Sequence, residues 1–387
     1  MPMKTLIKEQ ENYILNLRRT LHQNPEVSWQ EYETSKLIKT ELDAIGIPYE
    51  SLAGTGVIAT IGIPSRGKTV ALRADMDALA VTEKNTLDYA SSNPGVMHAC
   101  GHDGHTAMLL GAARVLKMLE NDINGCIKLI FQPAEEMVEG AKTMIKAGAI
   151  DTVEGIFGIH LWSGLKIGKI ACGNGPQMAS GDYVVVDIEG KGGHGSLPHQ
   201  GVDAIVALSS FLLNIQSMVS REIDPLDPAV LTFGEVKSGT RFNVLSSKAH
   251  VEGTVRCFNP EIRSKFPEII TRYGNNICDA HRATFHLNYT EGTPPTINDA
   301  HCAHLARLAA SEFLDKSAIV DIDKTTGSED MAYYLEKIPG AIAFVGAGNA
   351  SKGCDFPHHH PKFNIDEDSL IIGMELYVRF ALNFLNQ

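Results

Sequence analysis

The sequence predicts a two-domain α/β protein in which a small domain interrupts a larger one with a mixed sheet. Strands alternate with helices towards both ends of the chain, which is typical of a sheet with helices on its faces. Between residues 181 and 291 the order changes to β-α-β-β-α-β, the split βαβ or ferredoxin-like arrangement. A chain of 387 residues is also longer than one compact core supports. We therefore expect an α/β domain built from residues 1–180 and 292–387, with a ferredoxin-like domain of residues 181–291 inserted into it.

The elements of the larger domain follow from apolar spacing and from end signals. Residues 69–76 are nearly all apolar, as expected for a strand buried on both faces. The second helix ends at Gly46 with Pro48 just beyond, a normal C-terminal signal. The expected helices cover residues 4–22, 29–44, 104–119, 139–147, 300–312, 328–336 and 367–385. The expected strands cover residues 56–63, 69–76, 126–132, 155–160 and 341–346.

The inserted segment has its own regular elements and clear boundaries. Its strands are expected at residues 183–189, 229–236, 248–257 and 284–289, and its helices at residues 202–219 and 261–280. Its flanks, Ser180-Gly181 and residues 292–295 (GTPP), contain the glycines and prolines expected between domains. A length of about 110 residues suits a small domain.

The overall composition excludes several classes of protein. A formal net charge of −12 is opposite to the basic surface that nucleic-acid binding needs, so we expect no nucleic-acid partner. Seven cysteines without a C-x-x-C pair fit a reducing compartment. The first 19 residues carry charges throughout, and no run approaches about 18 apolar residues, so we expect neither a signal peptide nor a membrane span. These features favour a cytoplasmic protein that acts on small molecules.

The most informative segment is residues 97–105, MHACGHDGH. Thiolate, imidazole and carboxylate are the ligand types that divalent transition metals prefer. The segment holds five side chains of these types: His98, Cys100, His102, Asp103 and His105. Because they surround two glycines just before an apolar helical run, we predict a metal centre at this loop.

Further candidate ligands lie at the ends of other predicted strands, where open α/β sheets bind their ligands. Glu135 and Glu136 follow one apolar strand, and His160 ends another. An isolated Glu pair is most often solvated, and a lone His among apolar residues most often belongs to the core. Beside a Cys/His cluster, these residues become candidate ligands or proton acceptors. Asp75 and Asp77, at a third strand end, either support ligands through hydrogen bonds or cap a turn.

Three later segments are weaker candidates. Residues 357–361, PHHHP, place three histidines before the last helix, and at most two can face one site; an accidental surface tract is the alternative. The glycine-rich residues 190–196, which include His194, allow the backbone to approach a ligand closely. Residues 240–244 offer the amide of Asn243 after a strand. For the last two segments an ordinary turn is the alternative.

Four motifs together resemble those of the M20 metallopeptidases. Within that family they are most similar to the amidohydrolase branch, which contains hippurate hydrolases, N-acyl-amino-acid deacylases and plant auxin-conjugate hydrolases. The motifs are residues 73–79 (RADMDAL), 98–103 (HACGHD), 131–136 (FQPAEE) and 192–196 (GGHGS). The resemblance runs from about residue 17 to residue 370. It implies a two-metal catalytic domain and an inserted lid domain through which such proteins commonly form homodimers.

The resemblance also implies a role for each matching residue. Glu135 is expected to be the general base. His194 is expected to polarise the scissile carbonyl, often in the partner subunit's active site, and Asn243 to contact the substrate near it. The implied metal ligands are Cys100, which would bridge two metals, and His102, Glu136, His160 and His359.

The last implied ligand lies in the histidine tract of residues 357–361, and the chain departs from the family pattern at one other position. The pattern of histidine, one variable residue and proline selects His359, and His358 and His360 remain rivals. Ala80 stands where the branch usually has proline, which should alter a turn and leave the chemistry unaffected.

The expected activity is hydrolysis of the amide bond of N-acyl amino acids or similar small conjugates. Two divalent ions per subunit are expected, Zn²⁺ or Mn²⁺ first, with Ni²⁺ or Co²⁺ open. The alternative activity is that of a metallo-dipeptidase or aminopeptidase, because the same kind of site cleaves peptide amides. A catalytically silent ligand-binding relative is a further alternative, but it would be expected to lack Glu135 or a ligand, and none is missing.

Overall fold

The computed structural model describes residues 2–387, and the chain in it divides into two compact units. The first unit takes the residues up to Gly175, then Ile297–Asp323 and Asp330–Gln387. The second unit takes Pro176–Thr296 and a short return segment, Lys324–Glu329. The inserted unit therefore contains the segment expected at residues 181–291 and adds the return segment, which has no sequence signal of its own.

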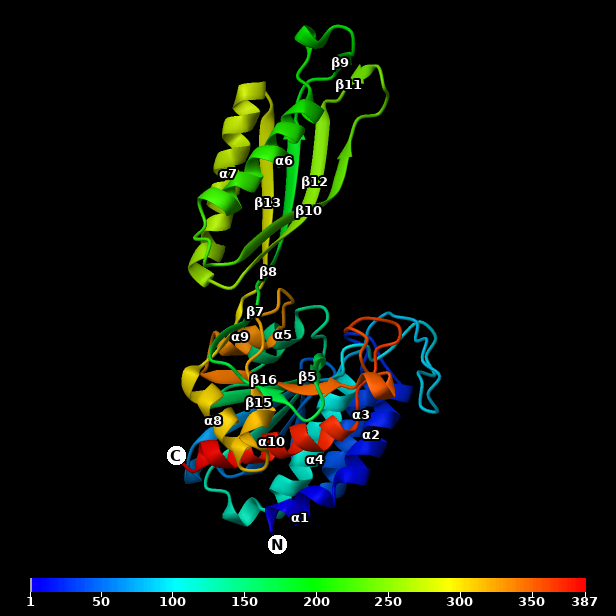
Figure 1. Cartoon of the computed structure of the whole chain (residues 1–387), viewed down its shortest axis with the longest axis vertical. Coiled ribbons are helices and arrows are strands. Elements are labelled where there is room, and N and C mark those ends of the chain that lie inside the picture. Colours follow the sequence, from blue (N-terminus) through cyan, green and yellow to red (C-terminus); the bar gives the residue numbers. More distant parts are fainter. Residues whose placement is uncertain (1) are drawn as a thin grey trace. The chain divides into compact units, whose positions relative to one another are not determined.

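The first unit is built on an eight-stranded sheet with the order β1-β2-β4-β3-β5-β16-β6-β15 (Figure 1). Strands β4, β3, β5 and β16 are parallel neighbours, whereas β1, β2 and β6 pair antiparallel to adjacent strands. The predicted mixed α/β architecture is confirmed. The strands are β1 (Tyr49–Leu52), β2 (Gly56–Gly62), β3 (Thr69–Asp75), β4 (Cys126–Gln132), β5 (Gly155–Lys166), β6 (Ile170–Ala171), β15 (Ile319–Val320) and β16 (Gly340–Gly348).

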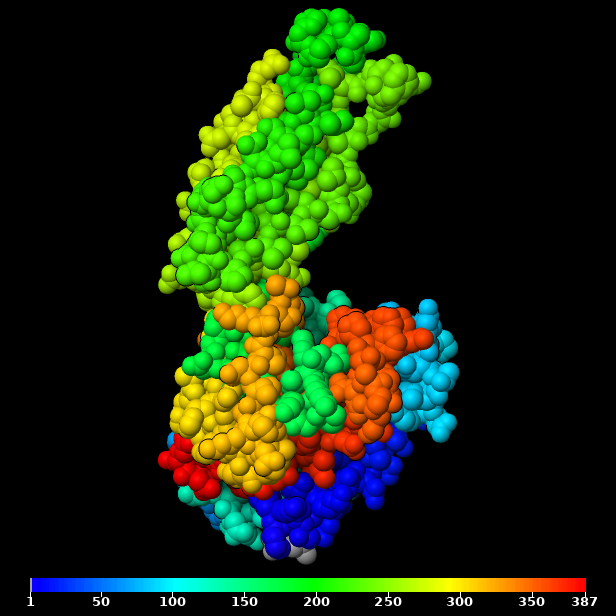
Figure 2. Space-filling view, viewed as in Figure 1, coloured from blue at the N-terminus to red at the C-terminus, as the bar shows by residue number. Residues whose placement is uncertain are grey.

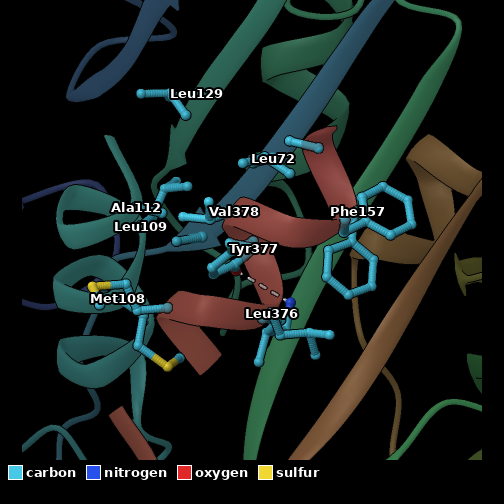
Figure 3. Packing of buried hydrophobic residues seen from close by; sticks show 14 of the residues in the cluster. Leu72, Met108, Leu109, Ala112, Leu129, Phe157, Leu376, Tyr377 and Val378 are labelled. Carbon is cyan, nitrogen blue, oxygen red and sulfur yellow. Dashed lines mark hydrogen bonds between the residues drawn. The ribbon is translucent and has the colours of Figure 1, made fainter. Parts of the chain in front are cut away.

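Helices cover this sheet, and α4 and α10 pack against it to form the centre of the core (Figure 3). The helices are α1 (Met3–Lys8), α2 (Glu11–Gln23), α3 (Tyr32–Ile45), α4 (His102–Met118), α5 (Gly140–Lys146), α8 (Ala300–Ser311), α9 (Met331–Leu335) and α10 (Asp368–Leu385). Phe157 of β5 stacks on Phe380 of α10 with ring centroids 4.1 Å apart. The Tyr377 hydroxyl, also on α10, donates to the Arg73 carbonyl at 2.7 Å. Because α4 is buried on nearly every side, its N-terminus is held firmly against the sheet.

Local backbone features explain where the helices differ from the predictions. The expected helix at residues 4–22 is broken into α1 and α2 by a turn at Gln10. The Gln10 N–H donates to the Ile7 carbonyl, and its side-chain amide donates to the Leu6 carbonyl. The helix expected from residue 29 begins only at Tyr32, since Trp29 has a left-handed φ of 64°. Strands of two to four residues, such as β1, β6 and β15, are too short for periodicity to reveal.

The second unit has a four-stranded antiparallel sheet with the order β10-β12-β8-β13. Its elements follow the β-α-β-β-α-β order: β8 (Gly181–Glu189), α6 (Ala204–Arg221), β10 (Ala229–Ser238), β12 (Lys248–Cys257), α7 (Pro260–His281) and β13 (Thr284–Thr293). Val184, Val186 and Ile188 of β8 face a core that includes Phe211 of α6 and Phe266 of α7. The short strands β9 (Gly193–His194) and β11 (Val244–Leu245) pair with each other, and β7 (Gly175–Met178) pairs with β14 (Thr296–Asn298).

Helix α6 passes a simple test for a membrane span. Within residues 2–387 it is the one helix that is long and apolar enough to cross a membrane by length and composition. Its Ala207, Phe211, Ile215 and Met218 side chains are buried in the core of the second unit. A buried core helix passes the same test, so this finding is weak evidence for a membrane protein.

Candidate metal centre

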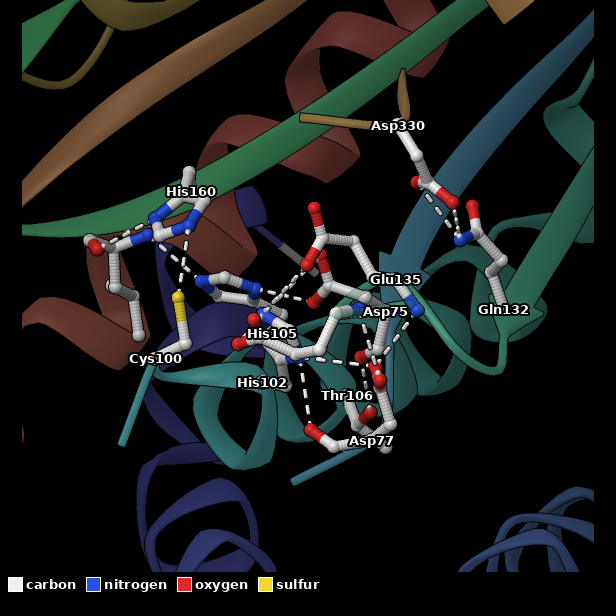
Figure 4. Close-up of polar contacts among 12 residues, drawn as sticks. Asp75, Asp77, Cys100, His102, His105, Thr106, Gln132, Glu135, His160 and Asp330 are labelled. Atoms are coloured by element: carbon white, nitrogen blue, oxygen red, sulfur yellow. Dashed lines mark hydrogen bonds and ion pairs between the residues drawn. The ribbon is translucent and has the colours of Figure 1, made fainter. Parts of the chain in front are cut away.

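The candidate site lies at the carboxyl ends of the parallel strands β3 and β4, beside the middle of the neighbouring β5 (Figure 4). The sequence predicted that the last of these strands would end at His160, but β5 continues to Lys166, so His160 belongs to the middle of the strand. The segment after β3 carries Asp77, the segment after β4 carries Glu135 and Glu136, and β5 carries His160. The N-terminus of α4 points its first residues at the same place, because Gly101, with φ of 95°, turns the chain sharply before His102.

Two groups of possible ligands overlap in this site and share one residue. The first consists of Cys100, His102 and His160, and the second of Cys100, Glu136 and His359; in each, the ligand atoms lie within 4.8 Å of one another. Cys100 Sγ lies 3.6 Å from His160 Nε2. His359 Nε2 lies 3.5 Å from Glu136 Oε1. The structure thus brings all five predicted ligands together, with the thiol common to both groups.

Backbone carbonyls orient two of the imidazole rings. His102 Nδ1 lies 2.9 Å from the Asp77 carbonyl, and His160 Nδ1 lies 2.8 Å from the Leu161 carbonyl. A carbonyl only accepts hydrogen bonds, so each Nδ1 carries a proton and Nε2 is the nitrogen left to face the cluster. Burial keeps the pKa of His160 well below its ordinary value, which keeps this ring neutral. Within residues 2–387, the buried atoms His102 Nε2 and Glu136 Oε1 have no hydrogen-bond partner.

The electrostatics of the site fit divalent cations. Burial and the nearby Glu136 carboxylate raise the pKa of the Cys100 thiol well above its ordinary value, so a thiolate there needs a cation to stabilise it. Burial lowers the pKa of His102, but the Asp75 carboxylate opposes this and raises it well above the ordinary value. Carboxylates, imidazole nitrogens and a thiol therefore converge on one place. Thiolate, imidazole and carboxylate are a suitable donor set for two metal ions.

The histidine tract at residues 358–360 divides by the contacts of each ring. His358 Nε2 lies 3.0 Å from the Leu161 carbonyl, and its ring packs 4.6 Å from that of Trp162. His360 stacks on Phe356 at 4.7 Å. Of the three, only His359 faces Glu136. The left-handed backbone at His359, with φ of 66°, directs its side chain towards that carboxylate. The segment containing this tract lies on the surface of its unit (Figure 2, orange-red).

The other metal-capable residues of the loop have hydrogen-bonding roles. His105 Nδ1 lies 2.6 Å from Asp75 Oδ1, and His105 Nε2 accepts the Leu161 N–H at 2.8 Å, so neither ring nitrogen is available to a metal. Asp103 accepts from Arg18 at 2.8 Å and lies 2.7 Å from His22 Nδ1. Both residues fix the N-terminal turns of α4 rather than ligate.

Asp77 fixes the two adjacent glutamates. Its Oδ1 accepts the Glu135 N–H and its Oδ2 accepts the Glu136 N–H, each at 3.1 Å. The Ser28 hydroxyl donates to Oδ2 at 2.6 Å. The sequence suggested either a support for ligands or a turn cap, and Asp77 does both. Arg73, buried in the middle of β3, is a supporting residue that the sequence analysis missed; a charged residue in an otherwise apolar strand is the signal that could have revealed it.

The two predicted substrate-handling residues lie together in the second unit. His194 in β9 pairs with Val244 in β11, directly after Asn243, and the Asn243 carbonyl accepts the Gly195 N–H at 2.9 Å. The Ser196 N–H donates to His194 Nδ1 at 3.2 Å. In a neutral ring the proton is therefore on Nε2, which leaves this nitrogen as a donor. Both side chains are exposed.

The sharing of Cys100 has a measurable consequence for metal content. Cys100→Ala is expected to lower the bound metal from about two equivalents per chain to below about one, because both groups lose a ligand. His359→Ala is expected to keep about one equivalent, because only one group is changed. Elemental analysis after dialysis checks both values, with the buried Cys126→Ala as control. A Cys100→Ala protein that keeps its full metal content would contradict the shared site.

Known proteins show the same fold and a related chemistry. The chain matches the model of peptidase family M20/M25/M40 over residues 71–383. A thermostable carboxypeptidase 2 of Saccharolobus solfataricus is 40% identical over 390 residues, which cover 100% of this chain and 98% of the relative. An N-acetyl-L-cysteine deacetylase of Bacillus subtilis is 41% identical over 362 residues, which cover 93% of this chain and 85% of the relative. A solved Bacillus subtilis structure, described as a dinuclear metal-binding peptidase of the M20 family, is 34% identical with a TM-score of 0.87 and covers 98% of this chain and 99% of its own.

These matches cover nearly the whole chain, including the strand ends and the late loop that carry the candidate ligands. The resemblance inferred from the four sequence motifs is confirmed, as is the prediction of a metal-dependent hydrolase that acts on amide bonds. The chain belongs to peptidase family M20/M25/M40.

Proposed function

We propose that this protein is a dinuclear metal-dependent amidohydrolase that releases the acyl group from N-acyl amino acids or similar small conjugates. The observation that carries the proposal is the pair of ligand groups sharing Cys100, with Glu135 beside them. Cys100, His102, Glu136, His160 and His359 would hold the metals, which would supply the Lewis acidity that activates water and polarises a carbonyl oxygen. Zn²⁺ or Mn²⁺ suits this mixed donor set first, with Ni²⁺ or Co²⁺ as alternatives.

Glu135 is proposed as the general base. Its Oε2 lies 3.9 Å from His102 Nε2, and it forms a further possible ligand group with His102 and Glu136, but it lies outside the two groups that share Cys100. The residue is 8% exposed, so its carboxylate sits at the edge of a protected site. In that place it accepts the proton of the attacking water and returns it to the leaving nitrogen. Positioned proton transfer of this kind contributes about 10²–10⁴-fold to the rate.

His194 and Asn243 are proposed to act on the substrate from the inserted unit. With its proton on Nε2, His194 is a donor for the negative charge that develops on the carbonyl oxygen. Asn243, beside it, offers an amide to the same region. We propose that the inserted unit is a ferredoxin-like lid and dimerisation domain, that the protein is a cytoplasmic homodimer, and that its site is complete only when the domains close.

A carboxypeptidase is the second candidate function. It is favoured by the thermostable carboxypeptidase, which is 40% identical over the whole of this chain. A deacylase and a carboxypeptidase both release an amino acid with a free carboxylate, and they differ in the group on its nitrogen. A dipeptidase or aminopeptidase instead needs a free amino group on its substrate.

A substrate panel separates these functions. Turnover is measured on N-acetyl, N-benzoyl and N-succinyl amino acids, on unblocked dipeptides and on N-blocked peptides, with Zn²⁺, Mn²⁺, Ni²⁺ and Co²⁺ added separately. The proposal expects the highest kcat/KM on N-acyl amino acids. Preference for N-blocked peptides would favour the carboxypeptidase, and preference for unblocked dipeptides would favour a dipeptidase. Glu135→Gln serves as the inactive control in every assay.

A further inference from the structure

Two buried carboxylates hold three consecutive backbone N–H groups in the turn that carries Glu135. Asp77 accepts the N–H groups of Glu135 and Glu136, each at 3.1 Å. The N–H of the preceding residue, Ala134, donates to Glu31 Oε1 at 2.9 Å. Residue 134 is 103 positions from Glu31 in the sequence, so this contact ties the N-terminal segment to the turn.

Glu31 has no exposed surface, and its side chain accepts hydrogen bonds from three donors. Its Oε1 also accepts the Trp29 N–H at 3.0 Å, and its Oε2 accepts the Thr55 hydroxyl at 2.7 Å. Burial raises the pKa of this carboxyl above its ordinary value, which shows that the position is costly for a charge. A buried acid with three donors is organised to hold backbone in place.

The backbone that Glu31 holds is strained. Ala134 has φ of 52° and Trp29 has φ of 64°, both in the left-handed region that non-glycine residues rarely adopt. A conformation of this kind persists only where surrounding contacts fix it. Because Ala134 directly precedes Glu135, a change in its φ would redirect the Glu135 side chain.

We propose that Glu31 is a positioning residue that fixes the left-handed conformation of Ala134 and thereby the aim of Glu135. The proposal rests on the proposed role of Glu135 as general base. Glu31 acts on one side of the turn, and Ser28, which donates to Asp77 at 2.6 Å, acts on the other. The segment before α3 thus holds the turn of Ala134, Glu135 and Glu136 in place, although it contributes no residue to the two ligand groups that share Cys100.

Three substitutions of Glu31 separate the acceptor from the charge. Glu31→Met keeps the size and removes both acceptors. Glu31→Gln keeps an acceptor for the two N–H groups, and its amide can donate to the Thr55 oxygen, so only the charge is lost. Glu31→Asp keeps the charge and withdraws it by one methylene, which gives a second test if Glu31→Met does not fold. Glu33→Met, an exposed Glu→Met change two residues away, is the matched control.

The expected result is a loss of turnover without a loss of binding. Glu31→Met should lower kcat about 10- to 100-fold relative to Glu33→Met, as expected for a misplaced catalytic group, with KM within about twofold and metal content unchanged. Glu31→Gln should stay within about threefold of wild type, because the hydrogen bonds remain. The double variant Glu31→Met/Ala134→Gly should recover part of the loss, because glycine adopts positive φ without steric cost.

Hydrogen exchange on the metal-free protein gives a readout that does not depend on activity. A peptide covering residues 131–140 should exchange faster in Glu31→Met than in Glu33→Met. Unchanged exchange with kcat within twofold of the control would overturn the proposal, as would a loss confined to KM or to metal content. If Glu135→Gln keeps its kcat, the proposed general base is wrong, while the exchange result still decides whether Glu31 holds the turn.

Discussion

Replacing Glu135 by Gln is expected to lower kcat by about 10²–10⁴-fold while the bound metal stays at the wild-type level. The amide is nearly the same size as the carboxylate, so the turn held by Asp77 is retained. It cannot accept a proton at neutral pH, so only the proton transfer is lost. Steady-state kinetics and elemental analysis on the same preparation check the two halves of this prediction.

The neighbouring Glu136 is the natural control, since the two residues share a turn and differ in the roles proposed for them. Glu136→Ala is expected to reduce metal content, because Glu136 Oε1, a buried oxygen that has no hydrogen bond within residues 2–387, lies 3.5 Å from His359 Nε2. A Glu135→Gln protein stripped of metal beside a fully loaded Glu136→Ala protein would show that the two assignments are reversed.

Replacing Arg73 by Met is expected to destabilise the metal-free protein by about 3–5 kcal/mol, because it leaves buried carboxylates without their cation. Arg73 donates to Asp75 at 2.8 Å, to Asp330 at 2.7 Å and to Gln132 at 2.9 Å. Asp75 is 1% exposed and Asp330 is fully buried. Against the effect of burial, His102 and Arg73 hold the pKa of Asp75 well below its ordinary value, so this acid stays ionised.

Urea unfolding of the metal-free protein measures this effect, with a lower midpoint and an unchanged slope as the expected outcome. Arg307→Met is the matched control, because Arg307 pairs with Asp321, whose side chain is 83% exposed, and should change stability by less than about 1 kcal/mol. Equal midpoints for the two variants would mean that the buried network is not needed for stability.

The grouping of the candidate ligands could be predicted largely because it follows from strand order. Glu136 follows the end of β4, and His160 lies in β5 level with the end of the neighbouring β3, so strand order alone brings them together. The family pattern selected His359 but left His358 and His360 as rivals, because the left-handed backbone that separates the three rings is not visible in the sequence. Glu31 and Arg73 were equally hidden, because their partners are distant in the sequence and become neighbours only through tertiary packing.

The position of the ligands along the chain sets when the site can form during synthesis. Cys100, His102 and His160 leave the ribosome before β16, which starts at Gly340 and is one of the two strands that flank β5. His359 follows β16 in the chain. Domains built from a continuous N-terminal segment can fold during translation, whereas this one needs both chain ends. A ligand set that includes His359 therefore cannot be complete until β16 and the loop after it have been made, and a shorter nascent chain can present at most the group of Cys100, His102 and His160.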